Sequence, residues 1–440
     1  MALGGGTWSA QNKVLPGTYI NVVSAKQGIP ASERGIVAFP MELSWGPVGK
    51  ATLITESQFS SNCRELLGYN YESEEMKPFR DIFCHAERLY LYRLAKNSVE
   101  ATGSFSDSSK LATAAYPGDR GNRITIQVKA SVDEEEKKIV STYLDGLLVD
   151  SQTVETAAEL TDNSFVTFEK GVELKEEMVT LSGGSNGDSV TGTEYQAFLD
   201  EMEGYYFNVL GSVVADETTK QLFAAYTQRM RDKVGKKFQC VLYRHPADYE
   251  GVVSVENKVT DDGAAESSAV YWAAGALAGC DINEELTNMA YDGEYAIDTG
   301  YRQADLETAL QSGKFIFHRQ DDEVRVLEDI NTLVSTTADK GDVFKQNMTI
   351  RVIDQIALDI ASTFNNTYNG KVPNDEDGRV GLKSDIVSIL NRIQTQRAIQ
   401  NFSEDDVSIS QGDTPKSVVG SIAIQVTGMM THLYLTVVVD

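Results

Sequence analysis

The sequence offers few side chains whose types and spacing could carry out chemistry. The segment WGPVGKAT, residues 45–52, contains the Gly-Lys pair of a phosphate-binding loop. Such a loop, GxxxxGK[ST], also needs a glycine five residues before its second glycine and a hydroxyl directly after the lysine. Ser44 and Ala51 occupy those two positions, so the glycine and the Mg²⁺-binding hydroxyl are both missing. The segment therefore predicts a turn between strands rather than a nucleotide site.

Two adjacent serines, Ser267 and Ser268, stand directly before the apolar helical run AVYWAAGALAG. A serine at the N-terminus of a helix in an α/β sheet can serve as a nucleophile. It can also cap the helix, because its hydroxyl accepts hydrogen bonds from the free backbone amides of the first turn. No Asp/His/Ser triad stands in a recognisable context, so we interpret the serines as a helix cap.

The histidines and the paired acidic residues give no better candidate. No histidine falls in an HExxH spacing or combines with carboxylates in a metal-ligand pattern. Adjacent carboxylates could flank a glycosidic bond, but a chain with 65 acidic residues contains such pairs by chance. We therefore predict no catalytic residue, no bound metal and no cofactor. The residues considered are His85, His245, His318 and His432, and the pairs Asp261-Asp262, Glu284-Glu285 and Asp321-Asp322.

The N-terminus lacks the basic start and apolar stretch of a signal peptide, so we expect the chain to fold in the cytoplasm of the cell that makes it. Its cysteines are then expected to stay reduced. They lie far apart without a CxxC motif, and we interpret them as buried small hydrophobic residues rather than zinc ligands. No run of about 18 apolar residues predicts insertion into a membrane. The cysteines are Cys63, Cys84, Cys240 and Cys280.

The charge balance argues against nucleic acid as a partner. The chain carries 65 acidic and 39 basic residues, which gives a formal net charge of -26 at pH 7. Binding to a phosphate backbone requires clustered positive charge. Strong negative charge instead keeps a protein soluble, and 41% hydrophobic residues are typical of a soluble globular protein.

The elements that would hold these residues form several domains, because 440 residues exceed one ordinary core. Short strands and acidic turns predict an all-β domain, bounded by flexible linkers such as LSGGSNGDSV. Strands that alternate with amphipathic helices follow, which is the pattern of a parallel sheet with crossover helices. The predicted parts are an N-terminal arm (1–25), an α/β region (26–98), a β domain (99–182), a second α/β domain (183–338) and a C-terminal domain (339–440).

The C-terminal domain combines two helical patterns with strand-like runs. In the second pattern, residues 378–400, apolar residues recur at helical spacing and four basic residues stand against one acidic residue, Asp385. Lys383 and Arg392 flank the apolar stripe on a helical wheel. The runs SVVGSIAIQV and MMTHLYLTVVVD predict strands, because they are rich in β-branched and apolar residues.

Segments spread in order over nearly the whole chain carry a resemblance to a known family, and none contains a catalytic motif. They are PGTYINVVSA, RGIVAFPMELSWGPVGKA, QFSSNCRELLGY, AAYPGDRGNRITIQV, ESSAVYWAAGALAGCDINEELTNMAYDG, VRVLEDINTLVS and NMTIRVIDQIALDI. Together they resemble contractile tail sheath proteins of phages and phage-tail-like bacteriocins, in particular those of Gram-positive bacteria.

The resemblance implies a multidomain α/β and β fold. Its parts would be an N-terminal α/β region, an outward β-sandwich, a non-catalytic subtilisin-like α/β central domain and an α+β C-terminal domain that faces the tail tube. It implies a structural subunit, not an enzyme, that polymerises as stacked hexameric rings around an inner tube. Sheaths of this family contract when the baseplate is triggered, and contraction drives the tube through a target cell envelope.

The resemblance also implies where subunits meet. Family members exchange terminal arms into the C-terminal domains of neighbouring copies, and an unpaired strand can join a neighbour's sheet in this way. Pairing of both ends within their own subunit is the alternative. The implied partners are other copies of the chain, the tail tube protein, and baseplate and collar or terminal proteins. The residues expected at these contacts are Tyr19, Ile20, Val22, Leu433, Leu435 and Val437 for strand exchange, and Lys383, Arg392 and Arg397 for an acidic tube surface.

Two other functions stay open on the sequence alone. One is a soluble hydrolase on an α/β scaffold with a β accessory domain. The other is a monomeric carbohydrate-binding or adhesion protein that presents the β domain. Striated tubes in electron micrographs would favour the polymer, and hydrolysis that depends on Ser267 or Ser268 would favour the enzyme.

Overall fold

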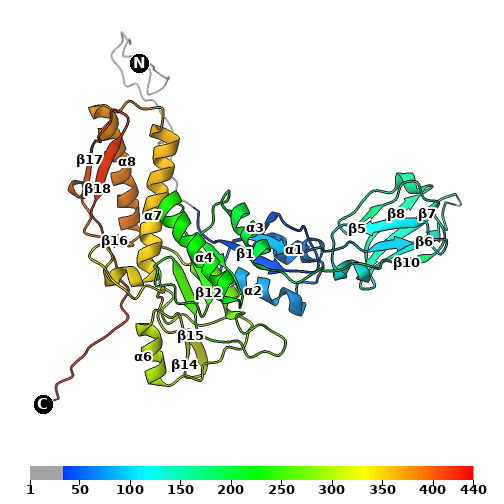
Figure 1. Cartoon of the computed structure of the whole chain (residues 1–440), viewed down its shortest axis with the longest axis horizontal. Helices are drawn as coiled ribbons and strands as arrows, with labels where there is room; N and C mark the ends of the chain where they lie inside the picture. Colours follow the sequence, from blue (N-terminus) through cyan, green and yellow to red (C-terminus); the bar gives the residue numbers. More distant parts are fainter. Residues whose placement is uncertain (1–32, 135, 440) are drawn as a thin grey trace, which may run out of the picture. The chain divides into compact units, whose positions relative to one another are not determined.

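A computed structural model describes residues 33–134 and 136–439 (Figure 1). These residues form two compact units, which are described separately. No helix in the described ranges is both long and apolar enough to span a lipid bilayer. The larger unit contains residues 33–354, 396–400 and 426–439, and the smaller unit contains residues 355–395 and 401–425.

The centre of the larger unit is a six-stranded sheet in the order β13-β12-β11-β1-β3-β2. Neighbouring strands are parallel except β2, which runs antiparallel to β3. Every residue of β1 but the last is buried, as expected for a parallel strand covered on both faces. The strands are β1 (Ile36–Glu42), β2 (Ala51–Thr55), β3 (Arg88–Leu94), β11 (Val209–Gly211), β12 (Gln239–Tyr243) and β13 (Val252–Val255).

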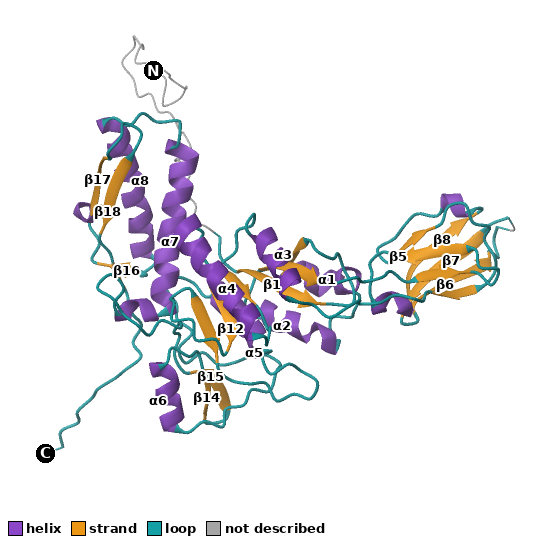
Figure 2. Ribbon diagram, in the orientation of Figure 1, coloured by secondary structure: helices purple, strands orange, loops and turns teal. Residues whose placement is uncertain are grey.

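Helices pack against both faces of this sheet (Figure 2). Val37 and Phe39 of β1 join a core with helices α1, α2 and α5, whereas Ile36 and Ala38 join a core with α3 and α4. The expected α/β region and the expected second α/β domain therefore contribute three strands each to one sheet. The helices are α1 (Glu56–Leu67), α2 (Lys77–Phe83), α3 (Gly192–Met202), α4 (Glu217–Arg229) and α5 (Ala269–Gly279).

The predicted all-β domain is a β-sandwich with its own core. One sheet has the order β10-β6-β7-β8 and the other β4-β5-β9, and all their pairings are antiparallel. Ile124, Ile126 and Val128 of β6 alternate inward, which is the period-2 pattern that predicted a strand there. The strands are β4 (Thr102–Ser104), β5 (Lys110–Ala114), β6 (Ile124–Ala130), β7 (Lys138–Leu144), β8 (Leu147–Val154), β9 (Val166–Phe168) and β10 (Met178–Thr180).

The two connections to the sandwich pair with each other, which corrects the expectation of flexible linkers. Val99 and Ser185 exchange backbone hydrogen bonds of 2.9 and 3.0 Å, and the amide of Asp188 donates to the carbonyl of Lys96 at 2.8 Å. A Cβ at Gly187 would lie 2.0 Å from that carbonyl oxygen. Glycine therefore permits close backbone approach here, and the sequence pattern had suggested mobility instead.

One aromatic side chain from outside the sandwich completes its core. Trp45 follows β1, is 1% exposed and belongs to the sandwich cluster. Its ring centroid lies 5.3 Å from that of Tyr116 and 6.1 Å from that of Phe165. Edge-to-face and offset aromatic packing of this kind stabilises an interface beyond simple burial. Trp45 therefore packs the sandwich against the rest of the larger unit.

We predict that the sandwich contributes little to assembly, provided that Trp45 is changed when the sandwich is removed. A chain that joins residue 100 to residue 182 through a short Gly/Ser segment loses both rings that cover Trp45, and exposed aromatic surface promotes aggregation. With the added change Trp45→Ser, the shortened chain is expected to fold and to form tubes, as judged by circular dichroism and negative-stain microscopy. A folded W45S chain without tubes would show that the lattice needs the sandwich.

The part after residue 338 differs from expectation at one place. The helix predicted over 378–400 ends at Thr395, because Arg397 has a φ of 64°, a left-handed conformation that a right-handed helix excludes. The run MMTHLYLTVVVD forms no helix or strand within the described chain, so the strand predicted there, which was expected to lack a local partner, stays a prediction. The remaining α-helices and strands of the described chain, including three that precede residue 338, are α6 (Gln303–Gln311), β14 (Phe317–Gln320), β15 (Glu323–Val326), α7 (Asn347–Thr363), α8 (Glu376–Thr395), β16 (Ile399–Gln400), β17 (Val407–Gln411), β18 (Val418–Ile422) and β19 (Gln425–Val426).

Candidate functional site

The two serines considered as nucleophiles have structural surroundings. Ser267 is buried, and its hydroxyl donates a hydrogen bond of 2.6 Å to the carbonyl oxygen of Val213. Ser268 occupies the N-cap position of α5, but its side chain makes no capping hydrogen bond, which corrects that part of the expectation. Its hydroxyl instead bonds the phenol of Tyr295. Neither serine is exposed in the manner of a nucleophile.

The histidines and cysteines are dispersed. His85 contacts Asp292 at 2.9 Å and His245 contacts Glu217 at 2.7 Å. All four cysteines are free thiols, and three are buried as expected, but Cys84 is exposed and corrects the interpretation for that residue. Within residues 33–134 and 136–439, no group of three or more His, Cys, Asp or Glu side chains is arranged to hold a metal ion.

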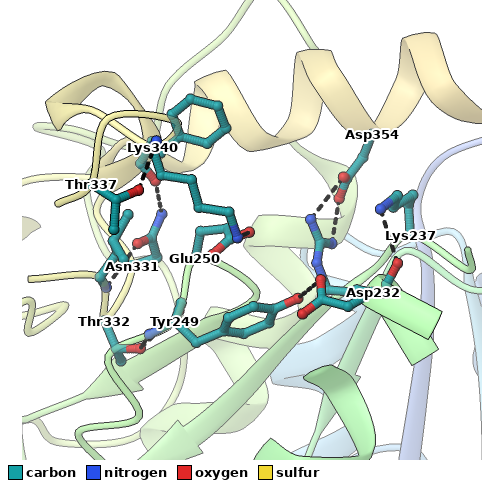
Figure 3. Close-up of polar contacts among 12 residues, drawn as sticks. Asp232, Lys237, Tyr249, Glu250, Asn331, Thr332, Thr337, Lys340 and Asp354 are labelled. Atoms are coloured by element: carbon teal, nitrogen blue, oxygen red, sulfur yellow. Dashed lines mark hydrogen bonds and ion pairs between the residues drawn. The ribbon is translucent and has the colours of Figure 1, made fainter. Parts of the chain in front are cut away.

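Buried ion pairs instead mark the start of helix α7. The carboxylate of Asp354 accepts two hydrogen bonds from the guanidinium of Arg231, at 2.6 and 2.8 Å (Figure 3). The side chains of Arg231 and Asp354 are 5% and 9% exposed. Burial by itself lowers the pKa of Arg231, but the attraction of Asp354 outweighs it and raises the pKa above the ordinary value. Arg231 therefore stays charged, and the pair has bidentate geometry.

A second buried pair lies one turn earlier in the same helix. Arg351 donates hydrogen bonds of 2.8 Å to Asp329 and 2.9 Å to the carbonyl of Glu284. Asp329 is 0% exposed and also accepts a 2.8 Å hydrogen bond from the side chain of Asn347. Burial opposes the charge on Arg351, but Asp329 raises its pKa overall. The α7 anchor is the name used below for Arg231, Asp329, Asn347, Arg351 and Asp354.

An ion pair and hydrogen bonds stabilise the loop that leads into α7. Lys340 forms an ion pair of 2.5 Å with Glu250 and lies 5.3 Å from the ring centroid of Tyr249 (Figure 3). The phenol of Tyr249 donates to Asp232 at 2.8 Å, and the hydroxyl of Thr332 donates to the Tyr249 carbonyl at 2.9 Å. Burial raises the pKa of Tyr249, so its hydroxyl stays a donor at neutral pH. These contacts hold the chain on both sides of the loop.

The anchor was missed by the sequence analysis, although a signal was present. Arg351 and Asp354 stand among the apolar residues Met348 and Val352 in the first helical pattern. Charged residues within an apolar stripe point either to a solvated edge or to buried partners. Only the structure supplies the partners, because Arg231 lies more than a hundred residues earlier in the chain.

The three basic residues predicted to face the tube have different surroundings. Lys383 lies in α8 and is 3.7 Å from the exposed carboxylate of Glu404. Arg392, in the same helix, pairs at 2.5 Å with Asp359, whose side chain is 0% exposed. Nine residues separate Lys383 and Arg392, which places them about 180° apart around the helix. Arg397 is exposed beyond the end of α8.

Charge reversal at Lys383 and Arg397 is predicted to slow assembly on an acidic tube by about tenfold at low salt, because complementary charge guides association. The effect should shrink as salt screens the charges. Arg392 is left unchanged, since its reversal would also break the pair with buried Asp359. The assembly rate of the K383E/R397E chain on purified tubes is measured by light scattering. Lys50→Glu, an exposed reversal elsewhere, is the control, and equal rates for all three chains would contradict the prediction.

The residues predicted for strand exchange fall into two groups. Tyr19, Ile20 and Val22 lie outside the described residues. Leu433 is 86% exposed, and Leu435 and Val437 are each 75% exposed. Residues 428–439 make no backbone hydrogen bond to the rest of the described chain. The C-terminal segment therefore presents apolar side chains and free backbone groups to solvent.

Comparison with known proteins finds domains of the same protein family along the chain. Four family models of phage tail sheath proteins match consecutive stretches. They are the tail sheath protein Gp18 domain III N-terminal region at residues 34–94, the β-sandwich domain at 96–186, the central domain at 188–332 and the C-terminal domain at 339–440.

Individual proteins agree with these models. The phage-like element PBSX protein XkdK of Bacillus subtilis is 30% identical, with 100% of both chains covered. The crystal structure of the sheath tail protein from Desulfitobacterium hafniense is 35% identical with a TM-score of 0.80, covering 93% of this chain and 100% of that one. The helical sheath of the anti-feeding prophage in its contracted state shares the fold at 13% identity and a TM-score of 0.56, over 97% and 100% of the two chains. A chain matched from residue 34 to residue 440 by sheath domains, and end to end by such a relative, belongs to the phage tail sheath protein family.

Proposed function

We propose that this chain polymerises as stacked hexameric rings around an inner tube and contracts to drive the tube through a target cell envelope. Membership of the sheath family supports a structural role in a tail or particle. The contracted helical sheath of the anti-feeding prophage, which shares the fold, supports assembly and contraction. Contraction would repack interfaces between subunits that move largely as rigid bodies.

The observation that carries this proposal is the unpaired C-terminal segment. An apolar, β-branched strand sequence with free backbone groups is an aggregation hazard unless another sheet receives it. In the smaller unit, β17 and β18 pair only with each other among the described strands, so each has an open edge. Beside β18 lies a groove of about 570 Å³, lined by Phe364, Leu382 and Val418 among others. We propose that the C-terminal segment of one copy adds to this hairpin in another.

The partners follow from the proposed architecture. Other copies of the chain would form the rings, the tail tube protein would lie inside, and baseplate and collar or terminal proteins would close the ends. Nucleic acid is not a partner in this proposal, since the net charge is -26. Assembly would take place in the cytoplasm of the bacterial host. The proposed domain layout keeps the boundaries predicted from the sequence, with a non-catalytic, subtilisin-like arrangement for the central domain.

Electron microscopy of the purified chain tests the proposal. Concentrated protein, or protein mixed with tail tubes, is expected to form striated tubes in negative stain. Particles that stay monomeric under all such conditions would contradict polymerisation. An esterase or peptidase activity that disappears in Ser267→Ala or Ser268→Ala would establish the alternative function, a hydrolase, for which the buried hydroxyl of Ser267 offers no support.

A further inference from the structure

A small cavity lies where Trp45 meets the β-sandwich, and no residue of the α7 anchor lines it. Its volume is about 80 Å³, and it is lined by Trp45 and Arg93, by Tyr116 of the sandwich, and by apolar side chains such as Ile54 and Leu91. The guanidinium of Arg93 is almost completely buried. It donates 2.7 Å hydrogen bonds to the carbonyl oxygens of Leu43 and Gly46 through Nε and Nη1.

Two residues that line this cavity each carry a buried donor without an acceptor. Within the described residues, neither Nη2 of Arg93 nor Nε1 of Trp45 has a hydrogen-bond partner. Each residue is 1% exposed. A buried donor without an acceptor costs roughly 1–3 kcal/mol, and more where the group is charged. Because both residues line one small cavity, the cavity is the place to look for the missing acceptor.

The charge of Arg93 is equally uncompensated. The other fully buried arginines of the larger unit, Arg231 and Arg351, each pair with an aspartate, which raises their pKa values. Burial lowers the pKa of Arg93 to about 10, which leaves it charged at neutral pH. A buried cation normally requires a negative partner. Arg93 has hydrogen bonds to two carbonyl oxygens but no ion pair to a carboxylate in the part of the chain that is described.

We propose that the cavity binds a small inorganic anion of chloride size, which accepts hydrogen bonds from Arg93 Nη2 and Trp45 Nε1. The cavity has a volume of about 80 Å³, and a water molecule occupies about 30 Å³ of liquid, so the cavity has room for a halide ion together with water. Bound there, the anion neutralises Arg93 and joins it to Trp45, the residue that completes the sandwich core. It therefore stabilises the packing of the sandwich against the rest of the larger unit.

One carboxylate, that of Glu65, affects whether the cavity binds an anion. Glu65 is exposed and also lines the cavity. Its charge weakens anion binding if the side chain stays in solvent. If the side chain turns inward, Glu65 itself becomes the counter-ion of Arg93. Glu65→Gln separates these cases, since it strengthens anion binding in the first case and removes the counter-ion in the second.

Thermal unfolding of the full chain in sodium chloride and in sodium gluconate, at matched ionic strength, measures the effect. Above the dissociation constant, each tenfold rise in chloride is expected to raise the folding equilibrium constant about tenfold, and gluconate is expected not to. Trp45→Phe keeps an aromatic ring but removes the N–H, so it should weaken the chloride dependence. Arg93→Met should abolish it. Arg302→Met removes an exposed guanidinium and should leave the dependence unchanged.

Several outcomes would overturn the anion site. Equal stabilisation by chloride and gluconate would mean a general salt effect and no site specific for a small anion. A second outcome would assign Glu65 as the counter-ion of Arg93. In that case chloride does not stabilise the parent chain, and Glu65→Gln lowers its stability as much as Arg93→Met does. If Arg93→Met does not fold, crystals of the parent chain grown in bromide decide the question. An anomalous peak within hydrogen-bond distance of Arg93 Nη2 supports the site, and no peak there refutes it.

Discussion

Removal of residues 432–440 is expected to leave a folded chain that no longer forms sheath. The side chains of Leu433, Leu435 and Val437 are at least three-quarters exposed, and the described part of the segment makes no backbone hydrogen bond to the rest of the chain. Loss of solvated residues changes the free energy of unfolding by less than about 0.5 kcal/mol. Loss of a strand that joins a neighbour's sheet, by contrast, removes the main-chain bonds that link subunits.

Single prolines make this test sharper than truncation. In an added strand, successive amides point in opposite directions, so only alternate residues bond a given neighbouring strand. Val437→Pro and Val438→Pro are therefore expected to differ, with tube formation abolished by the proline that removes a pairing amide. Val437→Thr and Val438→Thr keep the β-branched shape and the amide, and serve as controls. Tube formation is scored by negative-stain microscopy, with thermal unfolding measured in parallel.

The same phenotype is predicted for deletion of residues 1–24, which carry Tyr19, Ile20 and Val22. Regular tubes built by either truncated chain would refute strand exchange at that end. A truncated chain that unfolds would instead show that the end pairs within its own subunit.

Local patterns in the sequence were sufficient to predict many of the elements. The alternation in ITIQVKA matches β6 residue for residue, and the apolar spacing around Ile386 and Leu390 matches the buried face of α8. Period and composition report on whether one face of a segment is buried. They do not report which segments meet, and the pairing of Val37 in β1 with Val209 in β11 spans the whole inserted sandwich.

Sequence analysis missed features that depend on residue types found in two different structural settings, such as glycine in flexible linkers or at close backbone contacts. Gly187 was taken as part of a flexible linker, but its missing side chain allows two backbones to pair. Trp45, in a turn, has no periodic neighbours that would indicate its place in the sandwich core. Arg351 and Asp354 belong to residue types that usually lie on the surface, and their burial depends on partners supplied by distant parts of the chain.

Asp354→Ala is expected to destabilise the α7 anchor strongly. It leaves the guanidinium of Arg231 buried at 5% exposure without its bidentate partner. Breaking a buried ion pair by removing one member costs about 3–5 kcal/mol, because the remaining charge is uncompensated. Replacing both members by apolar residues, as in R231M/D354L, should recover most of that loss, since the desolvation cost of the two charges also disappears.

Urea unfolding of the two single variants and the double variant forms a double-mutant cycle that isolates the pair. Hydrogen exchange at the amides of α7 then shows where stability is lost, and early exchange is expected in residues 347–354. Asp322→Ala is the control, because its carboxylate is fully exposed, and no measurable change is expected. An Asp354→Ala chain as stable as the parent would mean that the pair contributes nothing to α7.

The functional consequence of the α7 anchor follows from where family domains begin. The central sheath domain covers residues 188–332 and contains Arg231 and Asp329, whereas the C-terminal sheath domain starts at residue 339 and contains Arg351 and Asp354. The two ion pairs of the anchor therefore connect the first residues of the C-terminal sheath domain to the central sheath domain.

In the proposed sheath, strand exchange pulls on the C-terminal domain while the rest of the subunit moves. Asp354→Ala should then form tubes that break or contract incompletely, whereas R231M/D354L, which restores stability without charge, should contract like the parent sheath. Incomplete contraction of both variants, observed by electron microscopy, would show that contraction needs the charges themselves rather than the stability of the anchor.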